Sequence, residues 1–231
     1  MRKQQHGFTL IEIAIVLVII GLLLGGVLKG QELITSARVR NIISQQDGVK
    51  AAYFGFLDRF RALPGDYNQA TTNIQNIGTT GCTGNGDGNG RIETAGSGTP
   101  TENVLVWEHL SKSGFISGSY TCAATESNAT TPTNAFAVRL QLVWDNVFDD
   151  SSGTSTARHN LKTGGQIPSD LLGEIDRKVD DGSATGGTFR FSAYNGGAGA
   201  PTGSGTCYLA ATPNNWNATS PAANCGGATL F

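Results

Sequence analysis

The sequence predicts an α+β protein in which a long N-terminal helix, transmembrane in its first half and amphipathic in its second, packs on a globular head with an antiparallel β-sheet. Three observations lead to this prediction. Residues 8–28 are an apolar run with one charged side chain. Apolar residues at three- and four-residue steps continue to residue 63. Strict alternation of apolar and other residues follows over 136–144, which is typical of a strand.

The apolar run is long enough to cross a membrane, because about 20 apolar residues span a hydrocarbon core of roughly 30 Å. Glu12 is its only charged residue. A carboxylate inside a membrane span costs on the order of 2.5–3.5 kcal/mol, so by default it indicates a function. Two simpler explanations stay open. The side chain could reach the lipid headgroups from the end of the span, or it could suit the positive end of the helix dipole as an acid in the first turn.

The block before this run, MRKQQHG, is short and basic and ends in glycine at the polar-to-apolar junction. The segment GFTLIE, residues 7–12, resembles the prepilin signature of type IV pilins and of the pseudopilins of type II secretion. The resemblance covers the first 30 residues. It implies that prepilin peptidase removes a leader, residues 1–7, by cutting after Gly7, and that the new terminus at Phe8 is N-methylated. It also implies that Glu12 pairs with the terminal amine of a neighbouring subunit during filament assembly.

This pairing has a physical reason of its own. A buried carboxylate is tolerated when a cation and hydrogen bonds match it. Cleavage gives Phe8 an α-amino group, and a neighbour displaced along the filament axis can present that amine to Glu12. Assembly would then relieve the cost of placing Glu12 in an apolar segment.

The resemblance implies a structural subunit of a type IV pilus-like or type II secretion pseudopilus filament. Its partners would be other subunits of the helical filament, prepilin peptidase and an assembly platform in the inner membrane. Before assembly the chain would be a single-pass protein of the bacterial inner membrane, and afterwards part of a periplasmic or extracellular filament. The alternative is a minor subunit whose head binds a ligand, a surface or a secreted substrate at the filament tip.

Charge and motifs argue against two other classes of function. The 231 residues carry a formal net charge of −2, and removal of Arg2 and Lys3 with the leader leaves 14 basic and 18 acidic residues. No nucleic-acid partner is expected from such a balance. The motifs G-x-S-x-G, H-E-x-x-H and S-x-x-K are absent, so no catalysis is predicted. Asp176, Asp180 and Asp181 could serve as paired acids in catalysis, but a helix end followed by a turn accounts for them more simply.

Residues 29–63 are predicted to continue the helix with one apolar stripe. Its members are Ile42, Val49, Tyr53, Phe56, Phe60 and Leu63, with Gln46 as the one polar residue. Such a stripe needs a sheet or another partner to cover it. The predicted end is Leu63, because Pro64 disfavours helical geometry in the residue before it. Two separate helices are the alternative, because glycines at 21, 25 and 26 each weaken a helix by about 1 kcal/mol relative to Ala.

The head, residues 64–231, is long enough for a single core. Thr99-Pro100-Thr101-Glu102 has the form of a capping box that opens a helix reaching Gly114. The alternating residues 136–144 predict a half-buried strand. Residues 167–179 predict a short helix, and 188–194 a second strand with Phe189 and Phe191 inward. The tail from Asn195 has no periodicity and is predicted to be a loop.

All four cysteines follow the apolar run: Cys82, Cys122, Cys207 and Cys225. Their spacing fits no C-x-x-C pattern, so an even set in an exported domain predicts two disulfides. Three connectivities are open, and we favour Cys82–Cys122 with Cys207–Cys225 because short loops are the simpler closure. The second pair also resembles the C-terminal disulfide loop of many type IV pilins.

The loop NGDGNGRIE, residues 85–93, has oxygen-bearing side chains at alternating positions, as in an EF-hand-type calcium loop. The predicted ligands are the side chains of Asn85, Asp87, Asn89 and Glu93 and the backbone carbonyl of Arg91. The twelfth position, where a glutamate belongs, is Gly96, and Glu102 could substitute although it also belongs to the capping box. A plain glycine-rich turn is the alternative. Calcium is the one cofactor that the sequence suggests.

Overall fold

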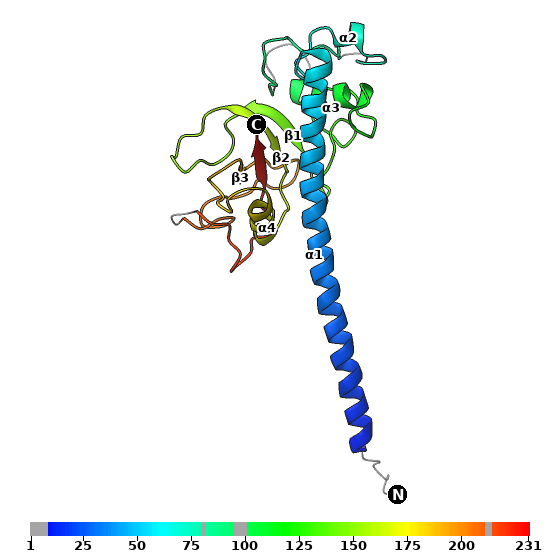
Figure 1. Cartoon of the computed structure of the whole chain (residues 1–231), viewed down its shortest axis with the longest axis vertical. Coiled ribbons are helices and arrows are strands. Elements are labelled where there is room, and N and C mark those ends of the chain that lie inside the picture. Colours follow the sequence, from blue (N-terminus) through cyan, green and yellow to red (C-terminus); the bar gives the residue numbers. More distant parts are fainter. Residues whose placement is uncertain (1–8, 80–81, 95–100, 211–213) are drawn as a thin grey trace, which may run out of the picture. The chain divides into compact units, whose positions relative to one another are not determined.

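The computed structural model describes residues 9–79, 82–94, 101–210 and 214–231. The chain divides into two compact units, Met1–Arg38 and Val39–Phe231. One helix, α1 (Leu10–Phe60), contributes residues to both units (Figure 1). It is continuous through Gly21, Gly25 and Gly26, so the alternative of two separate helices does not hold.

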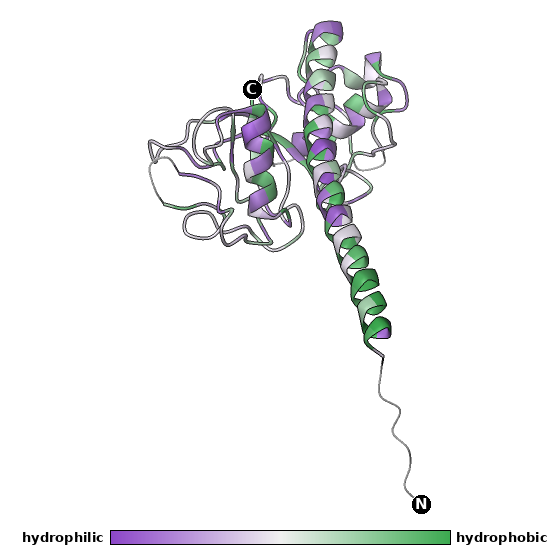
Figure 2. Cartoon of the chain, turned by 60° about the horizontal axis from the view of Figure 1, so that its bottom comes forward, coloured by the Kyte–Doolittle hydropathy of each residue, from purple (hydrophilic) through white to green (hydrophobic). Residues whose placement is uncertain are grey.

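Within the first unit, residues 10–28 of α1 present an apolar surface on all sides, apart from Glu12 (Figure 2). Residues 9–29 are all exposed, and Leu10 and Leu22 are 88% and 74% exposed. Within the described residues α1 is the one helix long and apolar enough to cross a membrane, with an 18-residue window of mean hydropathy 2.8 and no buried residue. A helix that is apolar all round needs lipid or other helices as its surroundings.

The second unit contains a four-stranded antiparallel sheet with the order β1-β2-β4-β3. Its strands are β1 (Gln141–Asp145), β2 (Arg158–Lys162), β3 (Phe189–Phe191) and β4 (Gly227–Leu230). Gln141 lies opposite Lys162, and Phe189 lies opposite Thr229. The last strand of the chain therefore lies inside the sheet, and β1 and β3 are its edges. Besides α1, the unit has the helices α2 (Ala70–Asn73), α3 (Glu102–Lys112) and α4 (Ser169–Val179).

Residues 39–60 of α1 bury their apolar stripe in this unit. Val39 and Ile42 pack with residues of α4 and β3 in one apolar cluster. Val49 and Phe56 belong to a second cluster, with residues of α3, β1 and β2. None of these four side chains is more than 7% exposed, so the head covers the apolar stripe that begins at Ile42, as predicted, and the buried face extends back to Val39. The polar member, Gln46, is also buried, and its Oε1 accepts a hydrogen bond from Thr229 Oγ1 at 3.0 Å.

The predicted end of the long helix was wrong by three residues. The helix α1 ends at Phe60, and Arg61 has a φ of +54°, in the left-handed region. The Arg61 amide still donates to the Leu57 carbonyl at 2.9 Å, as in a helix C-terminus closed by a left-handed residue. Pro64 therefore lies beyond the true stop and does not cause it.

The predicted strand over 136–144 was wrong at its start and in its burial. Asn134 Oδ1 accepts the amides of Phe136 and Val138, and Ala137 has a φ of +60°, so this stretch is a turn. The strand β1 begins only at Gln141, and residues 141–143 are all buried. Both of its faces are covered, so the half-buried pattern does not apply.

Two strands were not predicted at all. The strand β2 has the sequence RHNLK, which is polar, and β4 lies in the tail that was predicted to be a loop. The strand predicted over 188–194 exists but is limited to β3, with Phe189 and Phe191 buried. The helix predicted over 167–179 is α4, which begins at Ser169 after Pro168.

The two disulfides of the head join the cysteines in the short-loop connectivity. Cys82 pairs with Cys122 and Cys207 with Cys225, at Cα–Cα distances of 5.9 and 5.6 Å. Cys225 also forms an isolated antiparallel bridge with Ile167, two residues before α4 begins. The second disulfide thus holds the glycine-rich tail next to α4, directly before the tail enters the sheet as β4.

Candidate functional site

Glu12 forms a reciprocal capping box with Thr9 at the start of α1. The Thr9 amide and Oγ1 donate to Glu12 Oε2 at 2.8 and 2.7 Å, and the Glu12 amide donates to Thr9 Oγ1 at 3.3 Å. The pattern T-x-x-E over residues 9–12 is the sequence form of this motif. Glu12 was predicted in the first turn, but Thr9 was not predicted as its partner.

The carboxylate of Glu12 is exposed, although it is hydrogen-bonded locally. Gly7 and Phe8, the residues predicted to flank the cleavage site, lie outside the described residues. Around Glu12, residues 10–29 carry no buried side chain. The arrangement therefore offers one anionic group on an apolar helix surface, where a cation from a second chain could approach it.

The glycine-rich loop 85–93 lies against a second group of carboxylates. Asp66, Asp87 and Glu102 each present an oxygen, and these oxygens lie within 4.8 Å of one another. Asp66 and Glu102 are 4% and 7% exposed, while Asp87 is on the surface. Of the five residues predicted to bind calcium, the structure brings only Asp87 into this group. Asp66 was missed, because nothing in its local sequence connects it to a loop about twenty residues later.

The backbone of the loop donates to the two buried carboxylates. Asp66 accepts the amides of Asn89 and Gly90, both at 2.9 Å. Glu102 accepts the amides of Asp87 and Glu93 at 3.0 and 3.1 Å. Burial raises the pKa of Glu102 to about 7, against the opposing effect of these amide donors, and the nearby carboxylates raise it further. Burial also raises the pKa of Asp66.

The predicted role of Glu102 in a capping box was wrong. Its carboxylate bonds to the loop instead, and the N-cap residue Thr101 forms no side-chain capping bond. Thr99, Pro100 and Gly96 lie outside the described residues.

The side chains of Asn85 and Asn89, two of the other predicted calcium ligands, accept backbone amides. Asn85 Oδ1 accepts the Thr71 amide at 2.9 Å, and Asn89 Oδ1 accepts the Arg91 amide at 2.8 Å. The Asn89 amide group donates to the carboxylates of Asp87 and Glu93 at 2.9 and 3.2 Å.

His109 is fully buried and joins the turn at Gly65 to Gly84, the residue directly before the loop 85–93. Its Nδ1 accepts the Gly65 amide, and its Nε2 donates to the Gly84 carbonyl, both at 2.9 Å. This arrangement requires the neutral ring with a proton on Nε2. Burial lowers the pKa of His109 to about 4, and the carbonyl of Gly84 opposes that shift. The ring also stacks on Phe56 of α1, at 5.9 Å between centroids.

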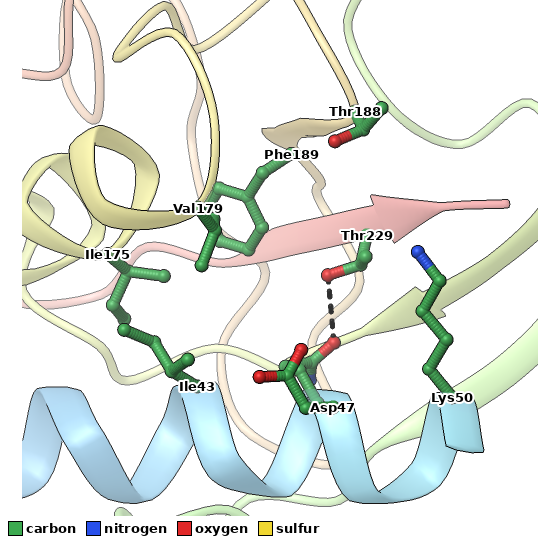
Figure 3. Close-up of a pocket in the computed structure, with 9 residues that line it drawn as sticks. Ile43, Asp47, Lys50, Ile175, Val179, Thr188, Phe189 and Thr229 are labelled. Carbon is green, nitrogen blue, oxygen red and sulfur yellow. Dashed lines mark hydrogen bonds between the residues drawn. The ribbon is translucent and has the colours of Figure 1, made fainter. Parts of the chain in front are cut away.

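A pocket of about 110 Å³ lies between residues 43–50 of α1 and the end of α4 (Figure 3). Ile43, Ile175, Val179 and Phe189 form its apolar walls, and it is also lined by Gln46, Asp47, Lys50, Thr188 and Thr229. Sites for small organic ligands usually measure about 300–1,000 Å³, so this volume suits water or a single small side chain.

The N-terminal residues match one known protein family. Residues 2–28 match the family described as the prokaryotic N-terminal methylation motif. Comparison with curated proteins finds no match, and comparison with solved structures finds none either.

An exposed apolar helix and this motif together fit a membrane-anchored precursor. The motif is the signature of type IV pilins and pseudopilins, and residues 2–28 include Gly7, Phe8 and Glu12. It supports a type IV pilin-like or pseudopilin subunit, and it implies processing by prepilin peptidase and filament assembly.

Proposed function

We propose that the chain is a structural subunit of a type IV pilus-like or type II secretion pseudopilus filament. Prepilin peptidase cuts it after Gly7, Phe8 is N-methylated, and residues 8–28 assemble into the filament core. One observation carries this proposal. Residues 10–28 expose apolar side chains all round, with the single carboxylate of Glu12 among them, inside a segment that matches the methylation motif.

Assembly changes the partner of Glu12. In the free chain its carboxylate is held by Thr9 of the same helix. In the filament the N-terminal amine at Phe8 of a neighbouring subunit replaces or joins that contact. The Thr9 donors carry no net charge, whereas the amine cancels the charge of the carboxylate, so the exchange favours the assembled state once the helix is buried among apolar neighbours. The apolar faces of residues 10–28 leave lipid for one another at the same time.

The chain is anchored in the bacterial inner membrane before assembly, where the assembly platform extracts it. The head then belongs to a periplasmic or extracellular filament. Two disulfides in the head suit an oxidising compartment of this kind. The role is structural and not catalytic.

A minor subunit at the filament tip is the second candidate. An open pocket of about 460 Å³, lined mainly by residues 57–69 and by Gly88 and Gly90, favours it. This volume falls in the range of small-ligand sites. In that case the head binds a ligand, a surface or a secreted substrate, and the apolar helix places it at the tip.

The experiment is to shear filaments from cells and locate the chain by gold labelling of the head. The proposal predicts labelled subunits along the whole filament length. Label confined to filament ends would favour the minor subunit. Complete retention of the chain in the membrane fraction, with unlabelled filaments, would contradict both.

Calcium binding at the glycine-rich loop is a separate proposal. Support comes from the approach of Asp66, Asp87 and Glu102, because clustered carboxylate oxygens are the ligands that Ca²⁺ prefers. Asp87 would be the exposed ligand, and Asp66 and Glu102 the buried ones.

A further inference from the structure

Three aspartates gather at the C-terminal end of α4, far along the chain from the loop 85–93. Asp176 is in the last turn of α4, and Asp180 and Asp181 follow it directly. Each presents a carboxylate oxygen, and these oxygens lie within 4.8 Å of one another. Asp176 is fully buried, Asp180 is half-buried and Asp181 is exposed. The group thus runs from the protein interior to its surface.

One oxygen of each carboxylate is fixed by a hydrogen bond. Trp216 Nε1 donates to Asp176 Oδ2 at 2.7 Å. The amides of Thr188 and Phe189 donate to Asp180 Oδ2, the second at 2.9 Å. The Ser183 amide donates to Asp181 Oδ1 at 2.8 Å. Three different segments therefore hold the carboxylates in place.

The second oxygen of Asp176 has no partner. Oδ1 is buried and forms no hydrogen bond in the part of the chain that the structure describes. A buried polar atom without a partner costs about 1–3 kcal/mol, and more when the group is charged. A cation would satisfy this oxygen and would also offset the charge of the two neighbouring carboxylates.

The surroundings of the group are also negative. The C-terminal end of a helix carries about half a negative charge, which disfavours acids placed there. Burial raises the pKa of Asp176 to about 7, the Trp216 and Gly182 donors oppose the rise, and Asp181 and Asp180 add to it.

Among the described residues, two basic side chains near the group pair with other acids. Lys178 pairs with Glu174 at 2.5 Å, and Arg190 pairs with Asp150. Arg177 Nη1 lies 3.5 Å from the Cβ position of Gly173, so this side chain runs back along the helix. Lys50, across the pocket of Figure 3, has its Nζ over the Phe231 ring at 5.8 Å from the centroid.

We propose that Asp176, Asp180 and Asp181 bind a divalent cation, with Ca²⁺ as the preferred ion. All three donors are oxygens, which select Ca²⁺ or Mg²⁺ over transition metals. Ca²⁺ accepts six to eight oxygen ligands in flexible geometry, so water can complete the shell on the exposed side at Asp181. The ion would tie the end of α4 to residues 182–189, which lead into the edge strand β3. This site goes beyond the filament role and is separate from the loop 85–93.

Terbium luminescence tests the proposal directly, because Tb³⁺ replaces Ca²⁺ and is sensitised by a nearby indole. Trp216 hydrogen-bonds to Asp176, so its ring lies next to the bound ion. In the full-length chain in mild detergent, tryptophan excitation should give Tb³⁺ emission that excess Ca²⁺ removes. Asp181→Asn, an exposed change that leaves the core intact, should weaken Tb³⁺ binding at least tenfold.

Two matched variants complete the experiment. Asp87→Asn alters the other carboxylate group and should leave the Trp216-dependent emission unchanged. Trp216→Phe should remove most of the emission while the Ca²⁺-dependent rise in melting temperature persists. If Asp181→Asn binds Tb³⁺ as tightly as the parent chain, or if the emission does not depend on Trp216, the proposal is wrong.

Discussion

The two halves of α1 have opposite surroundings. Residues 10–29 are exposed on every side, whereas Ile42, Val49 and Phe56 of the later half are at most 7% exposed. The later half meets α3, α4 and the sheet in two apolar clusters, and its single buried polar member, Gln46, bonds to Thr229. One continuous helix therefore combines a half that is covered within the chain and a half that is not.

The two halves of α1 therefore serve different purposes, folding of the head and assembly. The later half stabilises the head, so changes there should act on folding. The first half gains its burial only from lipid or from other subunits, so changes there should act on assembly and leave the head folded.

The largest effect is expected for Glu12→Gln in the first half. Glutamine keeps the capping box with Thr9, because Gln serves in that motif as well as Glu. It removes the negative charge that the neighbouring amine needs. Sheared filaments should therefore be lost, while membrane insertion is as good as before or better. The yield of filaments from cells that express only the variant measures this.

Thr9→Ala is the matched control. It breaks the capping box at a cost of about 1 kcal/mol but keeps the charge of Glu12, so assembly should largely survive. The reverse result, normal filaments with Glu12→Gln and none with Thr9→Ala, would show that Glu12 serves only as a helix cap.

The next effect is expected in the head. Replacing Cys207 and Cys225 by serine removes the disulfide that closes 18 residues before β4. The loss of loop closure should lower the free energy of unfolding by about 3 kcal/mol. The melting temperature of the full-length chain in detergent measures this change. Cleavage after Gly7 and membrane insertion should be unaffected, and a failure of either would break the separation of the two halves.

A third effect concerns pH and the ring of His109, which stacks on the buried half of α1. Its pKa is about 4 in the folded chain and about 6.5 when unfolded. Between these values the unfolded chain takes up a proton and the folded chain does not. The neutral His109 ring therefore contributes its full share to the free energy of unfolding above pH 6.5, and this share declines as the pH falls toward 4.

The decline can reach about 3 kcal/mol, at 1.36 kcal/mol per pKa unit. His109→Gln removes the titrating group, so its unfolding free energy should depend less on pH over this range. His159 is present in both proteins, so the difference isolates His109. Equal slopes for the two proteins would contradict the role of the buried neutral ring.

The smallest effect is expected at the glycine-rich loop. If residues 85–93 hold calcium, a chelator should lower the melting temperature of the full-length chain, and Asp87→Ala should remove much of that response. At a hundredfold excess over the dissociation constant, one ion stabilises by about 2.7 kcal/mol. In Asp181→Ala, the part of the chelator-induced fall in melting temperature that depends on Asp87 should remain. If Asp87→Ala responds to the chelator like the parent chain, the loop is a plain turn.

The sequence predicts both halves of α1, and only the position of the helix end differs. The apolar run and the stripe from Ile42 to Phe56 depend on local periodicity, and both are present in the structure. The end of the helix was missed because the helix stops where Arg61 adopts a left-handed conformation, and arginine gives no sequence signal for that conformation. Pro64 is the recognisable stop signal, but it lies three residues later. Thr9 could have been identified as the partner of Glu12 from T-x-x-E.

The head was harder to predict because its pairing is long-range. The strand β2 is polar because Asn160 and Lys162 face a buried polar network, in which Lys162 bonds to Gln141 at 3.0 Å and to Asp145. The strand β4 has the sequence GATL, and its place between β2 and β3 depends on distant partners. Likewise, the approach of Asp66 and Glu102 to the glycine-rich loop depends on where α1 and α3 lie.

The mass of the mature N-terminus is the most direct test of processing after Gly7 and of assembly through residues 8–28. Chains taken from sheared filaments should begin at Phe8 and carry one additional methyl group, with residues 1–7 absent. Peptide mass spectrometry of the filament and membrane fractions can read this terminus. A chain that keeps Met1, or that is cut beyond Leu28, would contradict assembly through residues 8–28.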